Sequence, residues 1–287
     1  MSESIQPRPG LLYVVATPIG NLEDITYRAV RILREADLVA CEDTRHTRKL
    51  LDRYGIENRL VSYHEHNEAE RAEELLLKLR EGAAIAQVSD AGMPGISDPG
   101  YRLIRLAIEN GIRVVPVPGP SALITAITGS GMPTDSFEFG GFLPAKSGQR
   151  RTVLEGMGRI GHTVVVYEAP HRIREALEEI VAVLGPTRPI VIARELTKVH
   201  EEFLRGTAGE LLDHVREREL KGEITLLIGK ALEGRERQKL DLGARLREIM
   251  REEKVDEKAA LKALAKERGV SKSEVYRELQ RSNIRKR

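Results

Sequence analysis

Aromatic residues and cysteine are scarce in this chain of 287 residues, which has no tryptophan, four phenylalanines and one cysteine, Cys41. The core must therefore be aliphatic, built from Leu, Ile, Val and Ala. One cysteine excludes an intrachain disulfide and any cysteine-based metal cluster, and we expect Cys41 to be a small buried hydrophobe at a strand end. No apolar run approaches the roughly 18 residues of a membrane span. The first ten residues lack a signal-peptide pattern, so we expect a cytoplasmic protein.

Several common active-site motifs are also missing. The first strand is not followed by the Gly-x-Gly-x-x-Gly turn of dinucleotide-binding proteins, and no P-loop is present, which disfavours NAD and ATP. The Gly-x-Ser-x-Gly element of Ser/His/Asp hydrolases is absent. His64, Glu65 and His66 lack the i, i+4 spacing of a helical zinc pair, so we expect a surface loop there and no metal site.

Apolar runs that alternate with helical patterns fill residues 11–230, which predicts an α/β fold with a helix-covered, mostly parallel sheet in the first half. We expect strands there at 11–16, 37–41, 59–63, 84–89 and 113–117. We expect helices at 24–35, 44–54, 68–81 and 101–110. Three prolines and a glycine within 116–120 then break the pattern and place a boundary after 117.

The second half, 118–234, starts with a helical run of small residues at 121–130. We expect strands at 137–142, 163–167, 189–193, 201–205 and 223–229, and helices at 170–184 and 208–219. The alternation at 137–142 and the shortness of 201–205 favour a mixed sheet with some antiparallel pairing. The predicted class is thus two α/β domains, 1–117 and 118–234, followed by a small helical domain, 235–287.

The C-terminal segment 235–287 has a charge of its own. It carries 17 Lys/Arg and 10 Asp/Glu, a net +7, whereas residues 1–234 carry 29 basic and 34 acidic residues, a net −5. This asymmetry favours an anionic macromolecular partner. Its apolar spacing is compatible with a helix-turn-helix. The alternative is a three-helix bundle that supports the main body and keeps its charges in solvent.

Three loops follow predicted strands and lead into helices: 16–26, 89–100 and 117–123. The second is the most informative, because it contains three Gly, two Pro and two Asp in twelve residues. Such loops at the carboxyl ends of strands are where open α/β sheets bind ligands. Backbone groups in them can approach a ligand closely, so a cleft at this end is predicted.

Several motifs follow one another in a characteristic order along the chain. They are Thr17-Pro18-Ile19-Gly20-Asn21-Leu22-x-Asp24-Ile25, Glu42-Asp43-Thr44-Arg45-His46-Thr47, Ser89-Asp90-Ala91-Gly92, Ser97-Asp98-Pro99-Gly100, Pro118-Gly119-Pro120-Ser121, Gly141-Phe142-Leu143-Pro144-Ala145-Lys146, Tyr167-Glu168, His171-Arg172 and Ala193-Arg194-Glu195-Leu196-Thr197-Lys198. Together they resemble the ribosomal RNA small subunit methyltransferase I family, which belongs with the tetrapyrrole methylases. The resemblance covers 11–230 closely and the C-terminal segment more loosely.

The resemblance implies that S-adenosylmethionine (S-adenosyl-L-methionine) lies in a cleft between two α/β domains. It also implies 2′-O-methylation of a cytidine in the decoding region of 16S rRNA, cytidine 1402 in the family, and a homodimer. By motif, the cofactor contacts are expected to be Pro18, Ser89, Asp90, Ala91, Gly92, Met93, Ser97, Asp98, Ser121, Ala122, Tyr167, Leu196 and Thr197. Met93 departs from the family, which more often has Thr, so position 93 contacts the cofactor through its backbone or tolerates either side chain.

A ribose hydroxyl is a poor nucleophile until it is aligned and its proton has an acceptor. The candidates for these roles are Asp43, Arg45, Lys198 and Glu201. Lys198 would act as a base only if burial or a nearby cation lowered its pKa. RNA affinity is expected from phosphate contacts of the C-terminal segment. Those candidates are Lys262, Lys266, Arg268, Lys272, Arg277 and Arg281, and the expected partner is 16S rRNA within the small ribosomal subunit.

Two other functions remain open from the sequence. One is a small-molecule methyltransferase that acts on a tetrapyrrole, which would share the fold and the cofactor. The start Thr17-Pro18-Ile19-Gly20-Asn21, in place of that group's Gly-Pro-Gly-Asp, and the basic segment argue against it. The other is a non-catalytic RNA-binding protein, which need not bind S-adenosylmethionine. The fold alone does not separate these functions.

Overall fold

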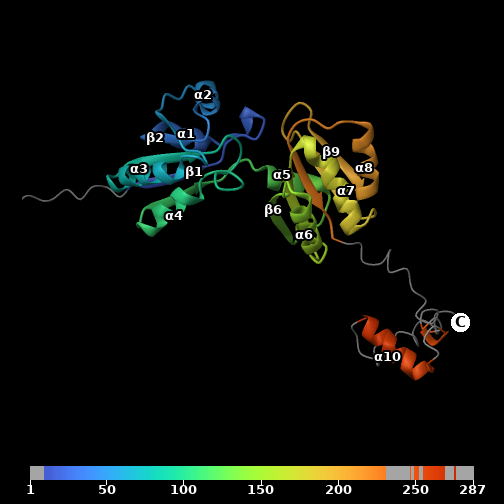
Figure 1. Cartoon of the computed structure of the whole chain (residues 1–287). Coiled ribbons are helices and arrows are strands. Elements are labelled where there is room, and N and C mark those ends of the chain that lie inside the picture. Colours follow the sequence, from blue (N-terminus) through green and yellow to red (C-terminus); the bar gives the residue numbers. More distant parts are fainter. Residues whose placement is uncertain (1–9, 231–245, 247–248, 252–254, 269–274, 276–287) are drawn as a thin grey trace, which may run out of the picture. The chain divides into compact units, whose positions relative to one another are not determined.

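The computed structural model describes residues 10–230, 246, 249–251, 255–268 and 275. Its contacts divide the chain into two compact units, Met1–Ala231 and Leu232–Arg287. The first unit contains two five-stranded sheets with helices around them (Figure 1). The predicted class, two α/β halves, is therefore confirmed, whereas the domain boundaries at 117 and 234 stay predictions.

The first sheet is entirely parallel and has the order β3-β2-β4-β1-β5. Its strands are β1 (Leu11–Val15), β2 (Leu38–Cys41), β3 (Leu60–Ser62), β4 (Ala84–Val88) and β5 (Arg113–Val117). The helices between them are α1 (Tyr27–Glu35), α2 (Thr44–Arg53), α3 (Glu68–Arg80) and α4 (Tyr101–Glu109), with a 3₁₀ turn, η1, at Leu22–Asp24. The parallel arrangement brings the ends of β1, β4 and β5 to one edge.

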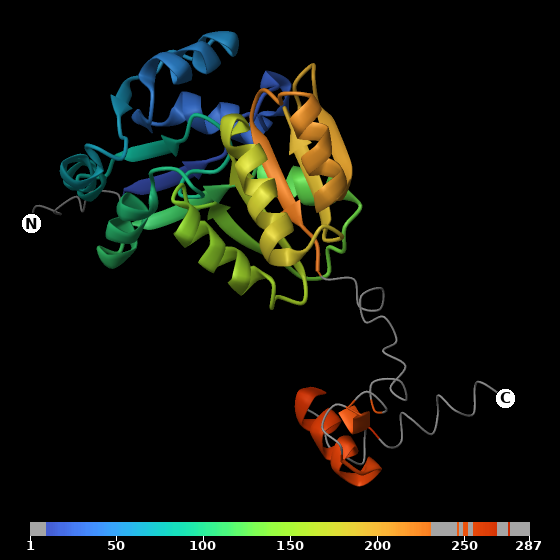
Figure 2. The ribbon, with the colours of Figure 1, turned by 45° about the vertical axis from the view of Figure 1, so that its right-hand side comes forward.

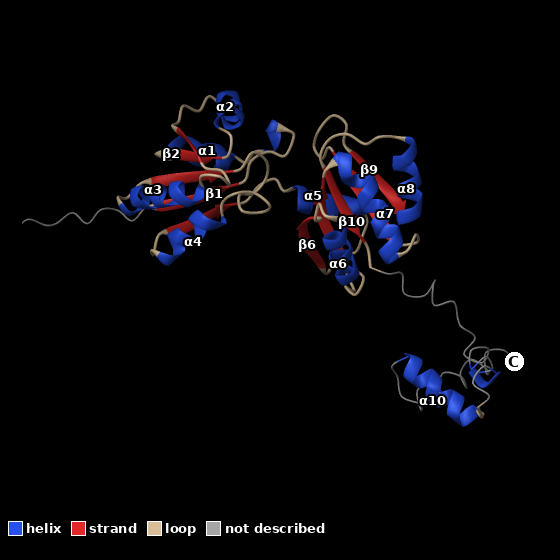
Figure 3. Ribbon diagram, in the orientation of Figure 1, coloured by secondary structure: helices blue, strands red, loops and turns tan. Residues whose placement is uncertain are grey.

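Alternate side chains of these strands pack on opposite faces. On β2, Leu38 and Ala40 join a core with α3 and α4, whereas Val39 and Cys41 join a core with α1 and α2. Cys41 is fully buried at the end of its strand, as predicted, and burial raises the pKa of its thiol. Figure 3 shows the helices around the strands of this sheet.

The second sheet is mixed, as predicted, with the order β6-β7-β10-β8-β9. Only β6 and β7 pair in parallel, and the remaining neighbours are antiparallel. Its strands are β6 (Phe137–Phe142), β7 (Thr163–Glu168), β8 (Pro189–Arg194), β9 (Glu202–Thr207) and β10 (Ile224–Ile228). Its helices are α5 (Ala122–Ser130), α6 (Ser147–Met157), α7 (Ile173–Leu184) and α8 (Ala208–Glu217), with a 3₁₀ turn, η2, at Pro170–Arg172.

Helices cover both faces of this sheet as well. On β10, Leu226 packs in a core with α6, α7 and α8, and these helices lie on one side of the sheet in Figure 2. The neighbouring Leu227 faces α5 instead. Ile19, from the loop after β1, belongs to the same apolar cluster as Leu227, so the two halves of the first unit share a core.

The start of one helix needs correction, and one helix was missed. Helix α1 begins at Tyr27 rather than at Asp24, because the Thr26 hydroxyl accepts a hydrogen bond from the Ala29 amide and caps the helix there. Helix α6 was not predicted. Its buried face includes Arg150 beside Leu154, and a charged residue at a core position breaks the apolar period that identifies a helix.

In the second unit the structure describes helix α10 (Glu257–Arg268). Leu246, Ile249, Leu261, Leu264 and Val275 form one apolar cluster, so this unit has a core of its own. The predicted helix-turn-helix depends on residues 269–274 and on 276 onward, which lie outside the described residues. None of the helices that the structure describes is both long and apolar enough to cross a membrane.

Candidate functional site

A cavity of about 350 Å³ lies where strand ends of both sheets meet. The expected cofactor contacts that line it are Ala91, Gly92, Met93, Ser97, Asp98, Ser121, Ala122, Tyr167 and Leu196. Further lining residues that the sequence did not single out are Ile19, Ile96, Phe142, Glu168, Ala169, Pro170, Gly222, Glu223, Ile224 and Thr225. Pro18, Ser89, Asp90 and Thr197 lie outside this lining. Their expected contacts with a cofactor stay predictions.

Backbone hydrogen bonds connect the loop after β1 with the loop after β4 at Gly92, which lines the cavity. Thr17 and Gly92 form an isolated antiparallel bridge, with amide-to-carbonyl distances of 2.9 and 3.0 Å. The Thr17 hydroxyl donates to the Ser89 carbonyl oxygen at 3.0 Å, and the Ser89 hydroxyl donates to the Gly92 carbonyl oxygen at 3.2 Å. Ser89 is buried. It therefore shapes the loop whose residues 91–93 face the cavity.

Asp90 links this loop to the start of α2, since its Oδ1 accepts a hydrogen bond from the Asp43 amide at 3.2 Å. Asp43 caps α2 by accepting from the Arg45 amide, and its carboxylate pairs with the Arg45 guanidinium at 2.8 Å. Hydrogen bonds from the Arg45 side chain and amide hold the pKa of Asp43 well below its usual range. Asp43 is consequently a weak proton acceptor, while Arg45 is exposed to solvent.

Lys198 lies between two carboxylates, 2.8 Å from Glu195 Oε1 and 3.1 Å from Glu223 Oε2. Partial burial works to lower the pKa of Lys198, but the hydrogen bonds to Glu195 and Glu223 outweigh it and raise the pKa. The condition for Lys198 to act as a base, a lowered pKa, is therefore not met, and a role for Lys198 in alignment stays a prediction. Glu201 Oε2 accepts from the Thr197 amide at 2.7 Å and so holds the turn between them.

Among the titratable groups that line the cavity, Asp98 has the pKa that its surroundings shift most. Burial, then the nearby charge of Glu42, raises the pKa of Asp98 to about 6, although a hydrogen bond with Ser89 opposes the shift. Ser97 and Asp98 also line a second, wider cavity of about 750 Å³ whose wall carries Glu42, Glu65 and Glu68. Asp98 thus lies where the two cavities adjoin.

Three non-glycine residues near the cavity have left-handed backbones. They are Ser97 (φ +60°), Glu195 (φ +51°) and Thr197 (φ +64°). Thr197 is the most unusual, because a β-branched residue is strongly disfavoured in this region. Ser97 lines the cavity and Glu195 and Thr197 flank its lining residue Leu196. Local strain of this kind is concentrated at binding and catalytic sites.

Tyr167 and Phe142 form an aromatic wall of the cavity on the side that the second half supplies. The ring of Tyr167 lies 5.0 Å from that of Phe139 and 5.5 Å from that of Phe142, edge to face in both pairs. Burial raises the pKa of the Tyr167 phenol, against a hydrogen bond from the Leu123 backbone. Such a wall suits an apolar, flat group.

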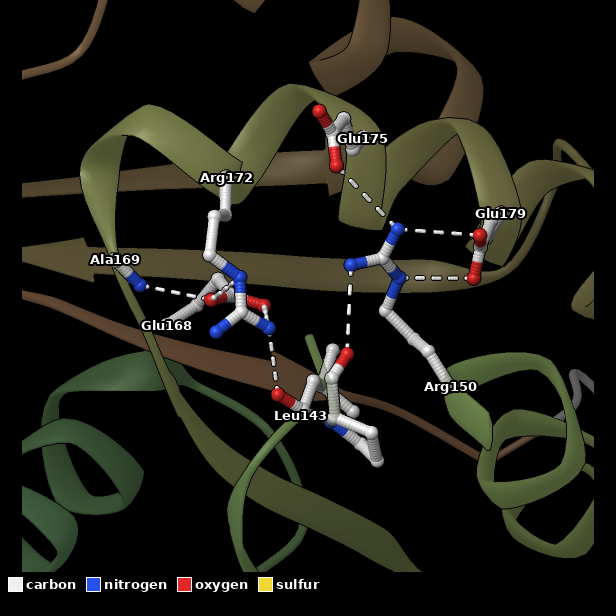
Figure 4. Close-up of polar contacts among 8 residues, drawn as sticks. Leu143, Arg150, Glu168, Ala169, Arg172, Glu175 and Glu179 are labelled. Atoms are coloured by element: carbon white, nitrogen blue, oxygen red, sulfur yellow. Dashed lines mark hydrogen bonds and ion pairs between the residues drawn. The ribbon is translucent and has the colours of Figure 1, made fainter. Parts of the chain in front are cut away.

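Figure 4 shows two ion pairs of the second half, Glu168 with Arg172 and Arg150 with Glu179. The buried Glu168 carboxylate pairs with Arg172 at 3.3 Å and accepts from the Ala169 amide at 2.8 Å. Burial raises the pKa of Glu168, opposed by that amide and by Arg172. Arg150 contacts Glu179 through two hydrogen bonds, 2.8 and 3.1 Å long. Sequence analysis identified Glu168 only as part of a motif, because its burial depends on the neighbouring strands.

The expected RNA contacts are described only in part. Lys262 lies on α10 and is exposed. Lys266 and Arg268 belong to the same helix, but their side chains are outside the described part. Lys272, Arg277 and Arg281 lie outside the described residues altogether. Among the described residues, no group of three His, Cys, Asp or Glu is placed to hold a metal ion.

Known proteins resemble this chain over nearly its whole length. The model of the Tetrapyrrole (Corrin/Porphyrin) Methylases matches residues 11–212. Ribosomal RNA small subunit methyltransferase I of Escherichia coli O157:H7 is 50% identical over 281 residues, 96% of each chain. The protein of the same name from Halalkalibacterium halodurans is 46% identical over 282 residues, 93% of each chain.

Solved structures share the fold at low identity. Uroporphyrin III C-methyl transferase from Thermus thermophilus has a TM-score of 0.55 at 20% identity and covers 77% of this chain and 97% of its own. A structure of that Thermus enzyme is complexed with S-adenyl homocysteine. Diphthine synthase has a TM-score of 0.60 at 15% identity and covers 77% of this chain and 90% of its own. The family match agrees with the motifs read from the sequence, and the chain belongs to the ribosomal RNA small subunit methyltransferase I family of tetrapyrrole methylases.

Proposed function

We propose that this protein transfers the methyl group of S-adenosylmethionine to the 2′-oxygen of a cytidine ribose in the decoding region of 16S rRNA. The observation that carries the proposal is the match to ribosomal RNA small subunit methyltransferase I at 50% identity over 96% of both chains. The bound S-adenyl homocysteine of a neighbour with the same fold supports the cofactor. The small ribosomal subunit as substrate, a homodimer and a cytoplasmic location are parts of the same proposal.

The residues of the smaller cavity fit the cofactor. Its volume, about 350 Å³, lies within the usual range for small-molecule sites. Tyr167 and Leu196 offer apolar walls to an adenine, and the Ser97 hydroxyl offers a hydrogen-bond partner to a ribose. Gly92, which also lines the cavity, has a φ of +78°, a conformation that side chains rarely adopt.

When bound, S-adenosylmethionine supplies an electrophilic methyl group on a positively charged sulfur. The chain must hold the ribose hydroxyl in line with that methyl group and give its proton an acceptor. We propose Asp98 for the second role, since it lies where the two cavities adjoin. A carboxyl with a pKa of about 6 is largely ionised at neutral pH and still accepts a proton readily.

The other candidates are then left with binding roles. Asp43 and Glu201 already accept backbone hydrogen bonds, at 2.7 Å each, and hold the chain around the site. Arg45, whose side chain is 87% exposed, is proposed to contact an RNA phosphate. Lys198 keeps its charge and orients Glu195 and Glu223 at the cavity's edge.

The C-terminal unit is proposed to supply affinity for RNA. Its sequence from 235 to 287 has a net charge of +7, and neutralised phosphates dominate affinity for nucleic acids. We therefore expect deletion of 236–287 to leave the calorimetric Kd for S-adenosylmethionine unchanged but to lower methylation of ribosomal subunits. Undiminished methylation by the shortened protein would contradict this role.

Transfer of labelled methyl from S-adenosylmethionine to small ribosomal subunits tests the function directly. The subunits are prepared from cells that lack this protein, and the labelled RNA is mapped by nuclease digestion. Label on a cytidine ribose in the decoding region supports substrate, atom and cofactor together. Subunits from cells that contain the protein serve as the control and should accept little label. Cofactor binding without transfer would point to another RNA or to a small molecule.

A further inference from the structure

Phe142, the last residue of β6, is an exposed aromatic residue at the edge of the smaller cavity. Its relative exposure is 54%, although large apolar side chains are usually covered. Tyr167 contacts it edge to face, with the ring centroids 5.5 Å apart. More than half of Phe142 therefore remains available to a ligand.

The segment after Phe142 is fixed by two arginines (Figure 4). The next residue, Leu143, is buried, and its carbonyl oxygen accepts from Arg172 Nη2 at 2.6 Å. The Pro144 carbonyl oxygen accepts from Arg150 Nη1 at 3.4 Å. Because both arginines are also held by carboxylates, the exposed ring is presented from a rigid segment.

Phe142 stands next to the place where the two cavities adjoin. A Cβ on the preceding Gly141 would lie 3.9 Å from Ser97 Oγ, and Ser97 lines both cavities. The wider cavity is lined by five glutamates (Glu42, Glu65, Glu68, Glu73 and Glu109) against two arginines (Arg102 and Arg105), so its net negative charge disfavours a phosphate. A nucleotide that approaches from this side is thus favoured to present its base and sugar, and a flat aromatic face suits the base.

We propose that Phe142 is the surface on which the base of the methylated nucleotide stacks while its ribose enters the site. The inference rests on the proposed function and adds to it a residue that positions the substrate. Unpaired RNA bases stack on aromatic side chains in sequence-specific recognition. Here one face of the stack would be supplied by a ring already supported by Tyr167.

Substitution of Phe142 gives the first test, with methyl transfer to small ribosomal subunits as the assay. Loss of a base–aromatic stack is worth about 5- to 150-fold in affinity, so Phe142→Ala should lower kcat/KM by a factor in that range. Phe142→Tyr should retain most of the activity. Phe137→Ala is the matched control, since Phe137 lies on the same strand, is 36% exposed and lines neither cavity. The Kd for S-adenosylmethionine should change less than twofold in each variant.

The absence of tryptophan allows a second measurement. Phe142→Trp, produced with 5-hydroxytryptophan, carries a fluorophore at this position alone and is distinguishable from the tryptophans of ribosomal proteins. Stacking on a base should quench its emission when substrate subunits are added. Phe137→Trp, labelled in the same way, should not respond.

The outcomes separate this inference from the proposed function. If the wild-type protein methylates subunits and Phe142→Ala has the same kcat/KM, the inference is overturned and the proposed function is unaffected. A Kd for S-adenosylmethionine weakened as much as kcat/KM would place the ring over the cofactor instead, and a changed sedimentation coefficient would place it in a subunit interface; either result refutes stacking. If the wild-type protein transfers no label, the proposed function fails and the inference with it.

Discussion

Replacement of Arg150 by alanine should destabilise the protein far more than the same change at the adjacent Arg151. The Arg150 side chain is 3% exposed and makes two hydrogen bonds to Glu179, at 2.8 and 3.1 Å. Glu175 lies 3.5 Å away. Arg151, by contrast, pairs with Glu155 along the helix at 3.3 Å, and both of these side chains are more than half exposed.

The expected magnitudes follow from this burial. Removal of one partner of a buried ion pair typically costs about 3–5 kcal/mol. Glu179 retains 20% exposure, so water can partly hydrate the carboxylate that Arg150→Ala leaves behind, and we expect a loss of about 2–3 kcal/mol. An exposed i, i+4 pair contributes about 0.3–0.5 kcal/mol, which sets the expectation for Arg151→Ala.

Urea unfolding followed by far-UV circular dichroism and by tyrosine fluorescence provides the measurement. Coincident transitions from the two probes justify a two-state free energy for each variant. A difference between Arg150→Ala and Arg151→Ala below about 0.5 kcal/mol would refute the reasoning, because burial would then contribute nothing to the pair. A second consequence is functional: Arg150→Ala frees the Pro144 carbonyl and should loosen the segment next to Phe142.

Three further changes test the cavity. Gly100→Ala should lower the unfolding free energy by at least about 2 kcal/mol in urea titrations, because Gly100 has a φ of +153° and a Cβ would lie 2.9 Å from the backbone nitrogen of Gly95; a loss below about 0.5 kcal/mol would contradict it. Asp98 has a pKa of about 6 in the folded protein against 3.8 for the free side chain, so its contribution to stability declines as the pH rises from about 4 to about 6 and is constant above that. Urea titrations across this range should therefore show Asp98→Asn gaining stability relative to the wild type with rising pH, and a constant difference would argue against the shift. Thr197→Gly should raise the unfolding free energy by about 0.5–1 kcal/mol, because it removes a β-branched residue from φ +64°, and a net loss would show that the threonine side chain stabilises the fold.

The fold could be predicted from local signals because most helices and strands begin and end at residues whose type marks an element boundary. Each strand of the first sheet is a short apolar run, and a capping residue such as Asp43 or Ser121 marks the helix that follows. In the exceptions, a second local interaction or a charged core residue overrides the expected pattern. Asn21 accepts a hydrogen bond from the Glu23 amide and stabilises a 3₁₀ turn, so α1 begins only at Tyr27, after its cap Thr26. Helix α6 was missed because Arg150 takes a core position.

Local sequence signals predicted only the wall of the cavity that the first half supplies, whereas Tyr167 and Leu196 on the opposite wall were expected from the family resemblance. The first half's loops carry their own glycine, proline and aspartate signals, and residues 91–93 line the cavity. The opposite wall comes from the ends of β6, β7 and β10, which meet through a strand order, β6-β7-β10-β8-β9, that no local pattern specifies. Phe142 and Thr225 are brought to the cavity by that order. The shifted pKa of Asp98 likewise depends on Glu42, 56 positions away in the chain.

The bridge between Thr17 and Gly92 has a consequence for how a ligand can enter. Two reciprocal backbone hydrogen bonds, together with the Thr17 hydroxyl on Ser89, make the loops after β1 and β4 one mechanical piece. Neither loop can then move without the other. The wall of the cavity that the first half supplies is therefore formed before a ligand binds. We expect the conformational adjustment during ligand entry to occur in the segments of the second half. In amide hydrogen exchange, the Thr17 and Gly92 amides should be protected before any ligand is added, and ligand binding should slow exchange mainly around 195–198 and 222–225.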